Sequence, residues 1–197
     1  MAQKKRYRIN EIFYSLQGEG ALRGTPAVFV RFSGCNLNCG FCDTNHSAYQ
    51  LMSIEEIITT AIEEHNRFSP LSKKAKNLLV LTGGEPALQI DDDLINALHE
   101  AHFYIAIETN GTLDLPKGID WTTCSPKEGS MLSISQADEV KIVYTGQPVE
   151  HYYKEISATH YILQPCSIQN TDEVIRYVKS HPHWRLSIQM HKYIGIE

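Results

Sequence analysis

The sequence has 197 residues and lacks any apolar run close to the roughly 20 residues that a membrane-spanning helix needs. Its basic first segment, residues 1–8, is not followed by an apolar stretch, so the pattern of a secretory signal peptide is missing as well. These two absences predict a cytoplasmic protein with no membrane partner.

The sequence also has few clustered basic residues. Its formal net charge is −5, and acidic residues are spread among the basic ones. Proteins that bind nucleic acids usually carry concentrated Lys and Arg. The short clusters at residues 4–6 and 73–74 are interpreted as solvated surface. We therefore expect a small-molecule partner and no nucleic acid.

The overall composition excludes a disordered chain. Hydrophobic residues make up 42% and charged residues 21%, as in ordinary globular proteins. The length suits one domain that buries a core of its own, so residues 1–197 are predicted to form a single domain.

Short apolar runs alternate with helical patterns along the chain. A capping box of Ser53 and Glu56 opens a predicted amphipathic helix with its apolar stripe over 54–62. Further helices are predicted over about 92–102, after Asn170, and over the shorter stretch 149–156. Six runs predict strands, and they are Ala27–Phe32, Leu78–Leu81, Tyr104–Ile107, Val140–Tyr144, Tyr161–Leu163 and Leu186–Ile188.

Strands that alternate with helices imply a mostly parallel sheet. Six or so strands with three or four helices are too few for a closed eightfold barrel. The predicted fold class is therefore α/β, an incomplete (modified) TIM-like barrel of about six parallel strands. In such a fold, functional residues lie at the carboxyl ends of the strands and in the loops that follow.

Three of the five cysteines fall within eight residues, at Cys35, Cys39 and Cys42. Secreted disulfide scaffolds instead have an even number of dispersed cysteines, so the cluster indicates a metal site. Thiolates suit iron–sulfur clusters and zinc. A 4Fe–4S cluster with three cysteine ligands leaves one iron open to chelate the amino and carboxylate groups of a methionine. With His46, the same spacing also fits a structural Cys3His zinc site, so spacing alone does not choose the metal.

The remaining cysteines, Cys124 and Cys166, lack a neighbouring partner and are interpreted as small buried hydrophobic residues.

Three polar motifs stand where predicted strands end. Thr82-Gly83-Gly84-Glu85-Pro86 follows Leu78–Leu81, and its adjacent glycines would let backbone groups approach a ligand closely. Glu108-Thr109-Asn110-Gly111 follows Tyr104–Ile107, with Asn-Gly supplying a turn. Ser125-Pro126-Lys127 ends the short segment 121–124. Each motif alone also reads as ordinary turn chemistry.

The C-x3-C-x2-C spacing, with Phe41 before the third cysteine, resembles the signature of the radical S-adenosylmethionine superfamily. The glycine-rich and strand-end motifs follow in that superfamily's order. The resemblance implies a radical S-adenosylmethionine core, with a 4Fe–4S cluster on Cys35, Cys39 and Cys42. It also implies contacts to S-adenosylmethionine, and these are assigned to Phe41, Gly84, Glu108, Ser125, Pro126 and Lys127. No catalytic side chain is expected beyond the cofactor chemistry, because the cofactor carries the reaction.

Segments along nearly the whole chain are similar to the 7-carboxy-7-deazaguanine synthase family. They are Asn10–Phe13, Ser15–Gly20, Arg31–Cys35, Cys42–Thr44, Trp184–Gln189 and His191–Tyr193. The family implies conversion of 6-carboxy-5,6,7,8-tetrahydropterin into 7-carboxy-7-deazaguanine with release of ammonia, a step towards queuosine. It further implies Mg2+, a homodimer, and an electron donor such as a flavodoxin or ferredoxin. The alternative is an activating enzyme that places a glycyl radical on a partner protein.

The family resemblance also assigns substrate residues. Arg31 has the planar fork that binds a carboxylate with two hydrogen bonds, although its residue type alone favours a surface ion pair. Thr82 is expected to contact substrate and cofactor, and Thr44 to bind Mg2+ through its hydroxyl. The pterin edge is expected to meet Leu16, Gln17 and Gly18, which otherwise form a plain glycine-rich loop. The terminal carboxylate at Glu197 is a further candidate for the pterin, with a frayed terminus as the alternative.

Overall fold

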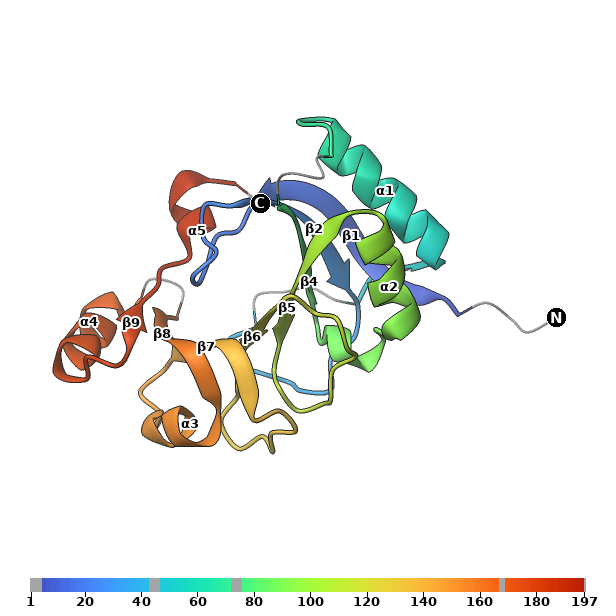
Figure 1. Ribbon diagram of the computed structural model, residues 1–197. Coiled ribbons are helices and arrows are strands. Elements are labelled where there is room, and N and C mark those ends of the chain that lie inside the picture. Colours follow the sequence, from blue (N-terminus) through green and yellow to red (C-terminus); the bar gives the residue numbers. More distant parts are fainter. Residues whose placement is uncertain (1–4, 43–46, 72–75, 167–168, 197) are drawn as a thin grey trace. The chain divides into compact units, whose positions relative to one another are not determined.

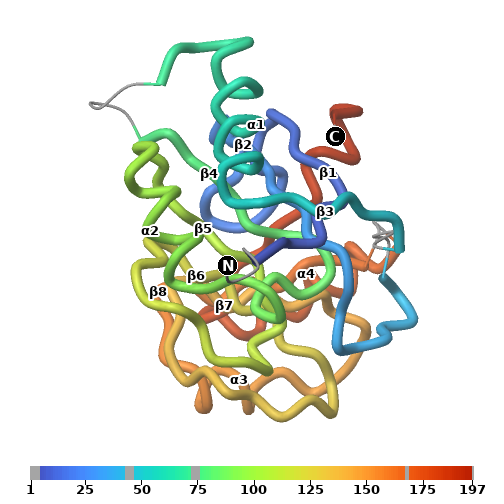
Figure 2. Tube along the Cα trace, turned by 90° about the vertical axis from the view of Figure 1, so that its right-hand side faces the viewer, coloured from blue at the N-terminus to red at the C-terminus, as the bar shows by residue number. Residues whose placement is uncertain are grey.

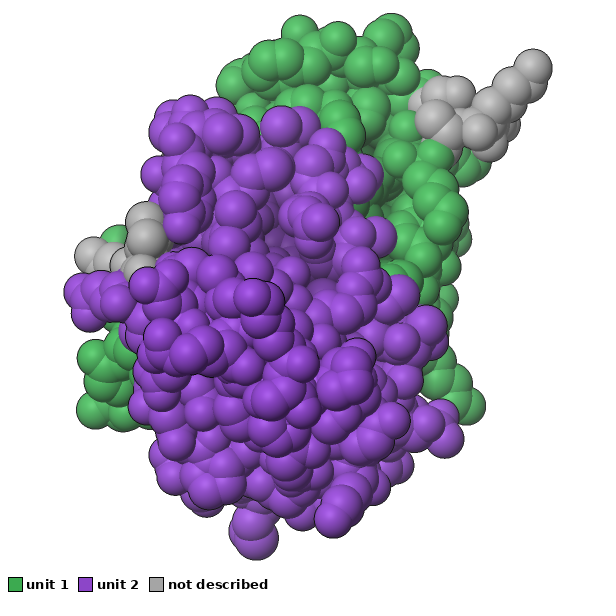
Figure 3. All heavy atoms as spheres, turned by 90° about the vertical axis from the view of Figure 1, so that its left-hand side faces the viewer, with its two compact units in different colours: residues 1–15, 26–108, 115–121 green, residues 16–25, 109–114, 122–197 purple. Residues whose placement is uncertain are grey.

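A computed structural model describes residues 5–42, 47–71, 76–166 and 169–196. The chain divides into two compact units, which Figure 3 shows in different colours. Unit 1 comprises residues 1–15, 26–108 and 115–121, and unit 2 comprises residues 16–25, 109–114 and 122–197. Whether the two units fold as the single predicted domain stays a prediction.

Unit 1 contains a sheet in the strand order β3-β1-β2-β4-β5. Strands β2, β4 and β5 are parallel, with Val28 opposite Leu79 and Leu79 opposite Ile105. Strand β3 pairs with β1 in the antiparallel direction. The strand bounds are β1 Tyr7–Leu16, β2 Pro26–Phe32, β3 Gln50–Met52, β4 Asn77–Gly83 and β5 Phe103–Thr109.

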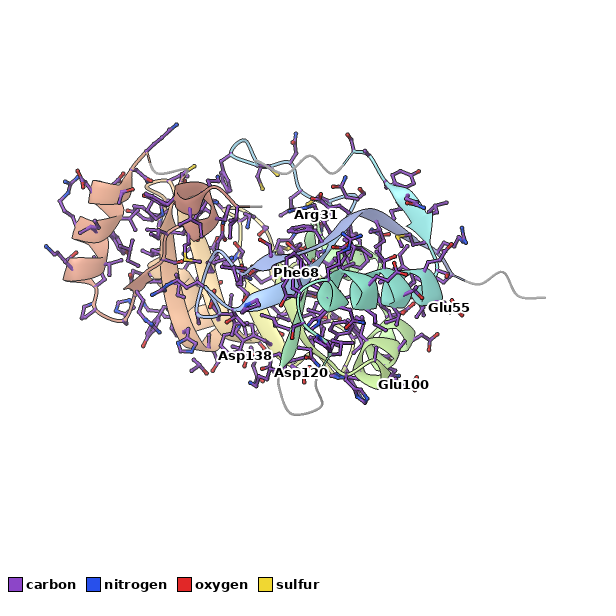
Figure 4. All side chains as sticks on the ribbon, turned by 90° about the horizontal axis from the view of Figure 1, so that it is seen from above. Arg31, Glu55, Phe68, Glu100, Asp120 and Asp138 are labelled. Atoms are coloured by element: carbon purple, nitrogen blue, oxygen red, sulfur yellow. The ribbon has the colours of Figure 1, made fainter. Side chains whose placement is uncertain are left out.

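Helices α1 (Ile54–Asn66) and α2 (Asp92–Glu100) lie beside each other and cover the sheet of unit 1 (Figure 1). Ser53 and Glu56 form both halves of the predicted capping box at the start of α1. The inner faces of both helices join the buried apolar core of the unit, while Glu55 and Glu100 are exposed on their outer faces (Figure 4). A short 3-10 helix, η1 (Pro86–Leu88), precedes α2.

Unit 2 contains parallel strands in the order β6-β7-β8-β9. Their bounds are β6 Trp121–Cys124, β7 Gln136–Tyr144, β8 Ser157–Pro165 and β9 Arg185–Leu186, and the helices are α3 Glu150–Glu155, α4 Thr171–Ser180 and α5 Met190–Ile194. Helices α3 and α4 pack on β8, and together with the strands they bury Trp184. Glu150, at the start of α3, accepts hydrogen bonds from Trp184 Nε1 at 2.8 Å and Tyr177 Oη at 2.9 Å.

The predicted α/β class and the four predicted helices are confirmed. All six predicted strands are present, although the last is displaced from Leu186–Ile188 to β9. Strands β1 and β3 and helix α5 were not predicted, and segment 121–124 is also a strand. Among the helices that the structure describes, none combines the length and apolarity needed to cross a membrane.

Candidate cluster and cofactor site

The three clustered cysteines lie on an irregular loop directly after β2. Their thiols form no disulfide, and Cys35 and Cys39 are partly exposed while Cys42 is exposed. The amide of Leu37 donates a hydrogen bond to Cys35 Sγ at 3.4 Å, and the amide of Cys42 donates to the carbonyl of Cys39 at 3.1 Å. The loop therefore turns back on itself with accessible thiols, and one sulfur receives the kind of amide hydrogen bond that tunes iron–sulfur clusters.

The chemistry of these donors fits a 4Fe–4S cluster, because three thiols outside any disulfide supply soft ligands and leave one iron without a protein ligand. Within the described parts of the chain, no three His, Cys, Asp or Glu side chains already surround a possible metal position. The match between these residues and a 4Fe–4S cluster thus depends on the type of their donor atoms and on the exposure of the cysteines. His46 of the zinc alternative and Thr44 of the Mg2+ prediction lie outside the described residues, as does Glu197.

The glycine motif after β4 is joined to the cysteine loop by backbone hydrogen bonds within unit 1. The amide of Gly84 donates to the carbonyl of Phe32 at 3.0 Å, and the amide of Glu85 donates to the carbonyl of Gly34 at 2.9 Å. A Cβ atom on Gly84 would lie 2.0 Å from the Gly34 carbonyl oxygen, so only glycine permits this approach. The position of Gly84, a predicted cofactor contact, is therefore tied to the start of the cysteine loop.

Two predicted substrate residues, Arg31 and Thr82, are register partners on the adjacent parallel strands β2 and β4. Arg31 Nε donates to Glu11 Oε1 at 2.5 Å, and the guanidinium carbon lies 5.5 Å from the centre of the Phe13 ring. Figure 4 labels Arg31 where it extends from the sheet. Glu11 and Phe13, both on β1, thus fix the arginine through Nε and the face of the guanidinium. The proposed carboxylate contact would use the terminal nitrogens.

Two other predicted cofactor residues lie in unit 1. Glu108 is half-buried on β5. Phe41 is 37% exposed on the cysteine loop. Glu108 lies at the carboxyl end of β5 and Phe41 in the loop that follows β2, and such strand ends and loops are where the fold places functional residues.

In unit 2, the predicted substrate residues Leu16, Gln17 and Gly18 open the segment 16–25, which is called the loop 16–25 although its first residue, Leu16, also ends β1. The amide of Gln17 donates to Thr25 O at 2.8 Å, and the Gln17 carbonyl accepts from the amide of Gly24 at 2.7 Å. Gln17 Oε1 accepts from the amide of Glu19 at 3.3 Å. These hydrogen bonds close the loop, so Gln17 is a structural residue of the loop as well as a candidate ligand.

The predicted cofactor motif Ser125-Pro126-Lys127 also lies in unit 2. The amide of Ser125 donates to Thr109 O at 2.7 Å. Lys127 Nζ donates to Ser125 O at 2.5 Å and to Ser125 Oγ at 2.9 Å. The hydroxyl and the ammonium of these two residues therefore lie together, while their contact with the cofactor stays a prediction.

Sequence reasoning missed a group of buried charged residues in unit 2. Glu139 and Lys141 lie within β7 and are 1% and 5% exposed. Burial raises the pKa of Glu19, but the charge and hydrogen bond of Lys141 outweigh this and lower the pKa to about 2. Burial raises the pKa of Glu139. The available signal was Lys141 within the apolar run Val140–Tyr144, with Glu139 directly before it, since charged groups are costly to bury without partners.

Comparison with known proteins agrees with this geometry. Residues 29–130 match the Radical SAM superfamily. The 7-carboxy-7-deazaguanine synthase of Bacteroides thetaiotaomicron is 56% identical over 96% of this chain and 98% of that protein. The enzyme of the same name from Nitratidesulfovibrio vulgaris is 40% identical over 96% and 99%.

The solved structure of QueE from Escherichia coli is similar to this chain with a TM-score of 0.75 and 28% identity. The similarity covers 94% of this chain and 95% of the QueE chain. Its coverage supports the incomplete α/β barrel predicted from the sequence. Taken with the three clustered cysteines after β2 and the glycine motif at the end of β4, these similarities show that the chain belongs to the radical SAM superfamily and, within it, to the 7-carboxy-7-deazaguanine synthase family.

Proposed function

We propose that the protein converts 6-carboxy-5,6,7,8-tetrahydropterin into 7-carboxy-7-deazaguanine with release of ammonia. The observation that carries this proposal is 56% identity to a synthase of that name across almost the full length of both chains. Three cysteine thiols outside any disulfide, at the spacing of the superfamily, support it chemically.

When bound, the reduced 4Fe–4S cluster and S-adenosylmethionine supply the one-electron chemistry that removes an unactivated hydrogen atom. The thiolates of Cys35, Cys39 and Cys42 hold the cluster in this proposal. The glycine motif offers its backbone at Gly84 to the methionine amino group, since the bare backbone admits close approach. The carboxylate of Glu108 accepts hydrogen bonds from the ribose hydroxyls.

The motif in unit 2 supplies the remaining cofactor contacts. Lys127 and Ser125 bind the methionine carboxylate and the ribose, because an ammonium and a hydroxyl held 2.9 Å apart can donate to neighbouring oxygens. Phe41 and Pro126 provide apolar contact that limits water near the cofactor.

The chain's contribution to the substrate is orientation. Arg31 holds the pterin carboxylate through its terminal nitrogens while Glu11 fixes Nε. Thr82, its register partner, presents a hydroxyl beside it. Leu16, Gln17 and Gly18 meet the amino-pyrimidine edge, joined by the terminal carboxylate of Glu197. Orientation of this kind supplies much of the rate in a reaction whose reactive group comes from a cofactor.

The proposal also includes Mg2+, a homodimer, and a flavodoxin or ferredoxin as electron donor. Mg2+ prefers oxygen ligands and keeps several waters, so one hydroxyl from Thr44 with the substrate's oxygens makes a reasonable set of ligands. The metal would then bind mainly together with the substrate.

A product assay tests the function. Protein reconstituted with iron and sulfide under anaerobic conditions is reduced and incubated with S-adenosylmethionine, the carboxytetrahydropterin and increasing Mg2+. We expect 7-carboxy-7-deazaguanine and an equal amount of ammonia, with turnover that rises with Mg2+. Formation of 5′-deoxyadenosine without any deazaguanine would contradict the proposed substrate and favour a different radical SAM reaction.

A further inference from the structure

Strand β7 of unit 2 has two faces of opposite character. Val140 and Ile142 belong to the apolar core of the unit. The alternate residues Glu139 and Lys141 point to the other face of the strand and are nevertheless almost fully buried. A buried ammonium is costly unless a partner satisfies it. The structure must therefore provide that partner from elsewhere in the chain.

The partner is Glu19, on the loop 16–25. Lys141 Nζ donates to Glu19 Oε2 at 2.7 Å, and the two side chains are 6% and 18% exposed. The other carboxylate oxygen, Oε1, accepts from Gln189 Nε2 at 2.9 Å. Gln164 of β8 also hydrogen-bonds to the Glu19 carboxylate. One carboxylate thus receives donors from β7, β8 and the segment that leads into α5.

Backbone contacts surround this carboxylate. The amide of Met190 donates to Gly18 O at 2.9 Å, and the amide of Gly20 donates to Ser187 Oγ at 3.1 Å. The loop 16–25, blue in Figures 1 and 2, consequently runs beside the red C-terminal segment. Glu19 lies one residue after Gly18, the end of the predicted pterin-binding triplet. Its two oxygens therefore connect that triplet to β7 and to the C-terminal segment at the same time.

Glu139 is the second buried carboxylate on which the charge of Lys141 acts. Its Oε2 accepts from the amide of Ala21 at 2.6 Å, while Oε1 has no hydrogen-bond partner among the described residues. Burial raises the pKa of Glu139, while Lys141, the Ala21 amide and Arg185 lower it and Glu19 raises it. Because Glu19 instead ionises readily, Lys141 acts mainly as the counterion of Glu19.

We propose that Glu19 and Lys141 are positioning residues that fix the loop 16–25 and the C-terminal segment 187–194 together against β7, and so align the pterin-binding edge of the loop. This inference depends on the proposed function for its substrate. Stability alone is a poor reason for the pair, since well-packed apolar side chains often replace buried ion pairs without loss. Three donors from three separate elements on one carboxylate instead specify a geometry.

The test combines Lys141→Met, Glu19→Gln and the double variant. Lys141→Met leaves Glu19 without its counterion, so the melting temperature should fall and the apparent KM for the carboxytetrahydropterin should rise about tenfold, the cost of one charge-assisted hydrogen bond. The KM for S-adenosylmethionine and the iron content should not change. The double variant should recover most of the melting temperature, because neither member of the Glu19–Lys141 pair is left without its partner, but it should keep the raised pterin KM.

Recovery of both the melting temperature and the pterin KM in the double variant would overturn the proposal, because the pair would then be purely structural. Glu150→Gln is the matched control. Its carboxylate also accepts several hydrogen bonds in unit 2, so it should lower the melting temperature without changing the pterin KM.

Hydrogen exchange separates this inference from the proposed function. Lys141→Met should speed amide exchange in both the loop 16–25 and the segment 187–194, whether or not the protein turns over the pterin. If Lys141→Met does not fold, Gln189→Leu removes one arm alone and should speed exchange in the same two segments. Unchanged exchange in either segment would overturn the proposal even in an active enzyme. Absence of pterin turnover in the parent would instead contradict the proposed function.

Discussion

The two units solve the problem of presenting functional groups in different ways. In unit 1, strands β2 and β4 are almost wholly apolar and buried, and the candidate site is placed by backbone contacts between the loops that follow them. In unit 2, β7 buries Lys141, whose charged partner Glu19 lies 122 residues away in the sequence. A backbone-built site shows itself as a local motif of glycine and cysteine. A site that is positioned by an ion pair between residues far apart in the sequence leaves no such local motif.

The largest expected effect is loss of the cluster in unit 1. Cys35→Ala, Cys39→Ala and Cys42→Ala each remove one of three thiolate ligands, so each should abolish cluster assembly and formation of 5′-deoxyadenosine. Iron and sulfide content after anaerobic reconstitution measures this directly.

Cysteines of unit 2 provide the control. Cys124 is buried beside Gly111, and Cys166 is partly buried after β8. Cys124→Ala and Cys166→Ala should retain iron, sulfide and most activity. A colourless Cys166→Ala protein would show that the ligands have been misassigned and that a cysteine outside the cluster loop binds the iron–sulfur cluster.

The second effect tests the backbone contact between the two loops of unit 1. In Gly84→Ala the new methyl group would meet the carbonyl of Gly34, a backbone group that cannot rotate away. Overpacking of this kind costs about 1–3 kcal/mol, and the shift in the loop should also weaken binding of S-adenosylmethionine. Thermal unfolding and a cofactor-binding titration would measure the two effects.

Gly40→Ala is the matched substitution, because a Cβ there meets nothing within 4 Å. Its free energy of unfolding should stay close to that of the parent. Equal stability of the Gly84→Ala protein would mean that the loops are free to separate, and the contrast between the two units would lose its basis.

The difference between local motifs and contacts distant in sequence also explains which parts of the fold could be predicted. Strands such as β2 and β4 were predicted because continuous apolar runs are typical of buried parallel strands. Helix α1 was predicted because its capping box is local. Strand β1 was missed since Arg8, Asn10 and Glu11 interrupt its apolar pattern, and β3 and α5 are too short to show a period.

The candidate site likewise has parts that could be predicted from the sequence and parts that could not. The cysteine loop and the glycine motif could be predicted because their chemistry requires particular residues at fixed spacing. The residue type of Arg31 favoured an ion pair, and the structure shows one, but its partner Glu11 could not be predicted. The pair of Lys141 with Glu19 could not be predicted either, because both partners are set by strand pairing and loop placement that no local pattern encodes.

The third prediction concerns Arg31. Arg31→Lys keeps a positive charge but loses the planar fork, so substrate binding should weaken by about 1–3 kcal/mol while the cluster survives. Glu11→Gln removes the charged partner of Nε and leaves the terminal nitrogens in place. It should change the pterin KM much less than Arg31→Lys does. Equal effects would mean that the ion pair, and not the fork, determines binding.

The smallest effect concerns Glu139 and the dependence of stability on pH. Burial raises the pKa of Glu139 above its ordinary value of 4.5, despite the opposing influence of Lys141. The stability that this group contributes is therefore complete below pH 4.5 and is lost as the pH rises through the folded-state pKa. Glu19 behaves in the opposite sense, because its pKa of about 2 places its loss of stability below pH 4.5. A scan of stability from about pH 5 to pH 8 thus separates the contribution of Glu139 from that of Glu19.

Glu139→Gln keeps an acceptor for the Ala21 amide and removes the titrating group, so its melting temperature should exceed that of the parent by a few degrees at pH 7 and by less at pH 5. Parallel melting curves across this range would mean that Glu139 titrates as it does in the unfolded chain, and that burial in unit 2 imposes no cost on this carboxylate.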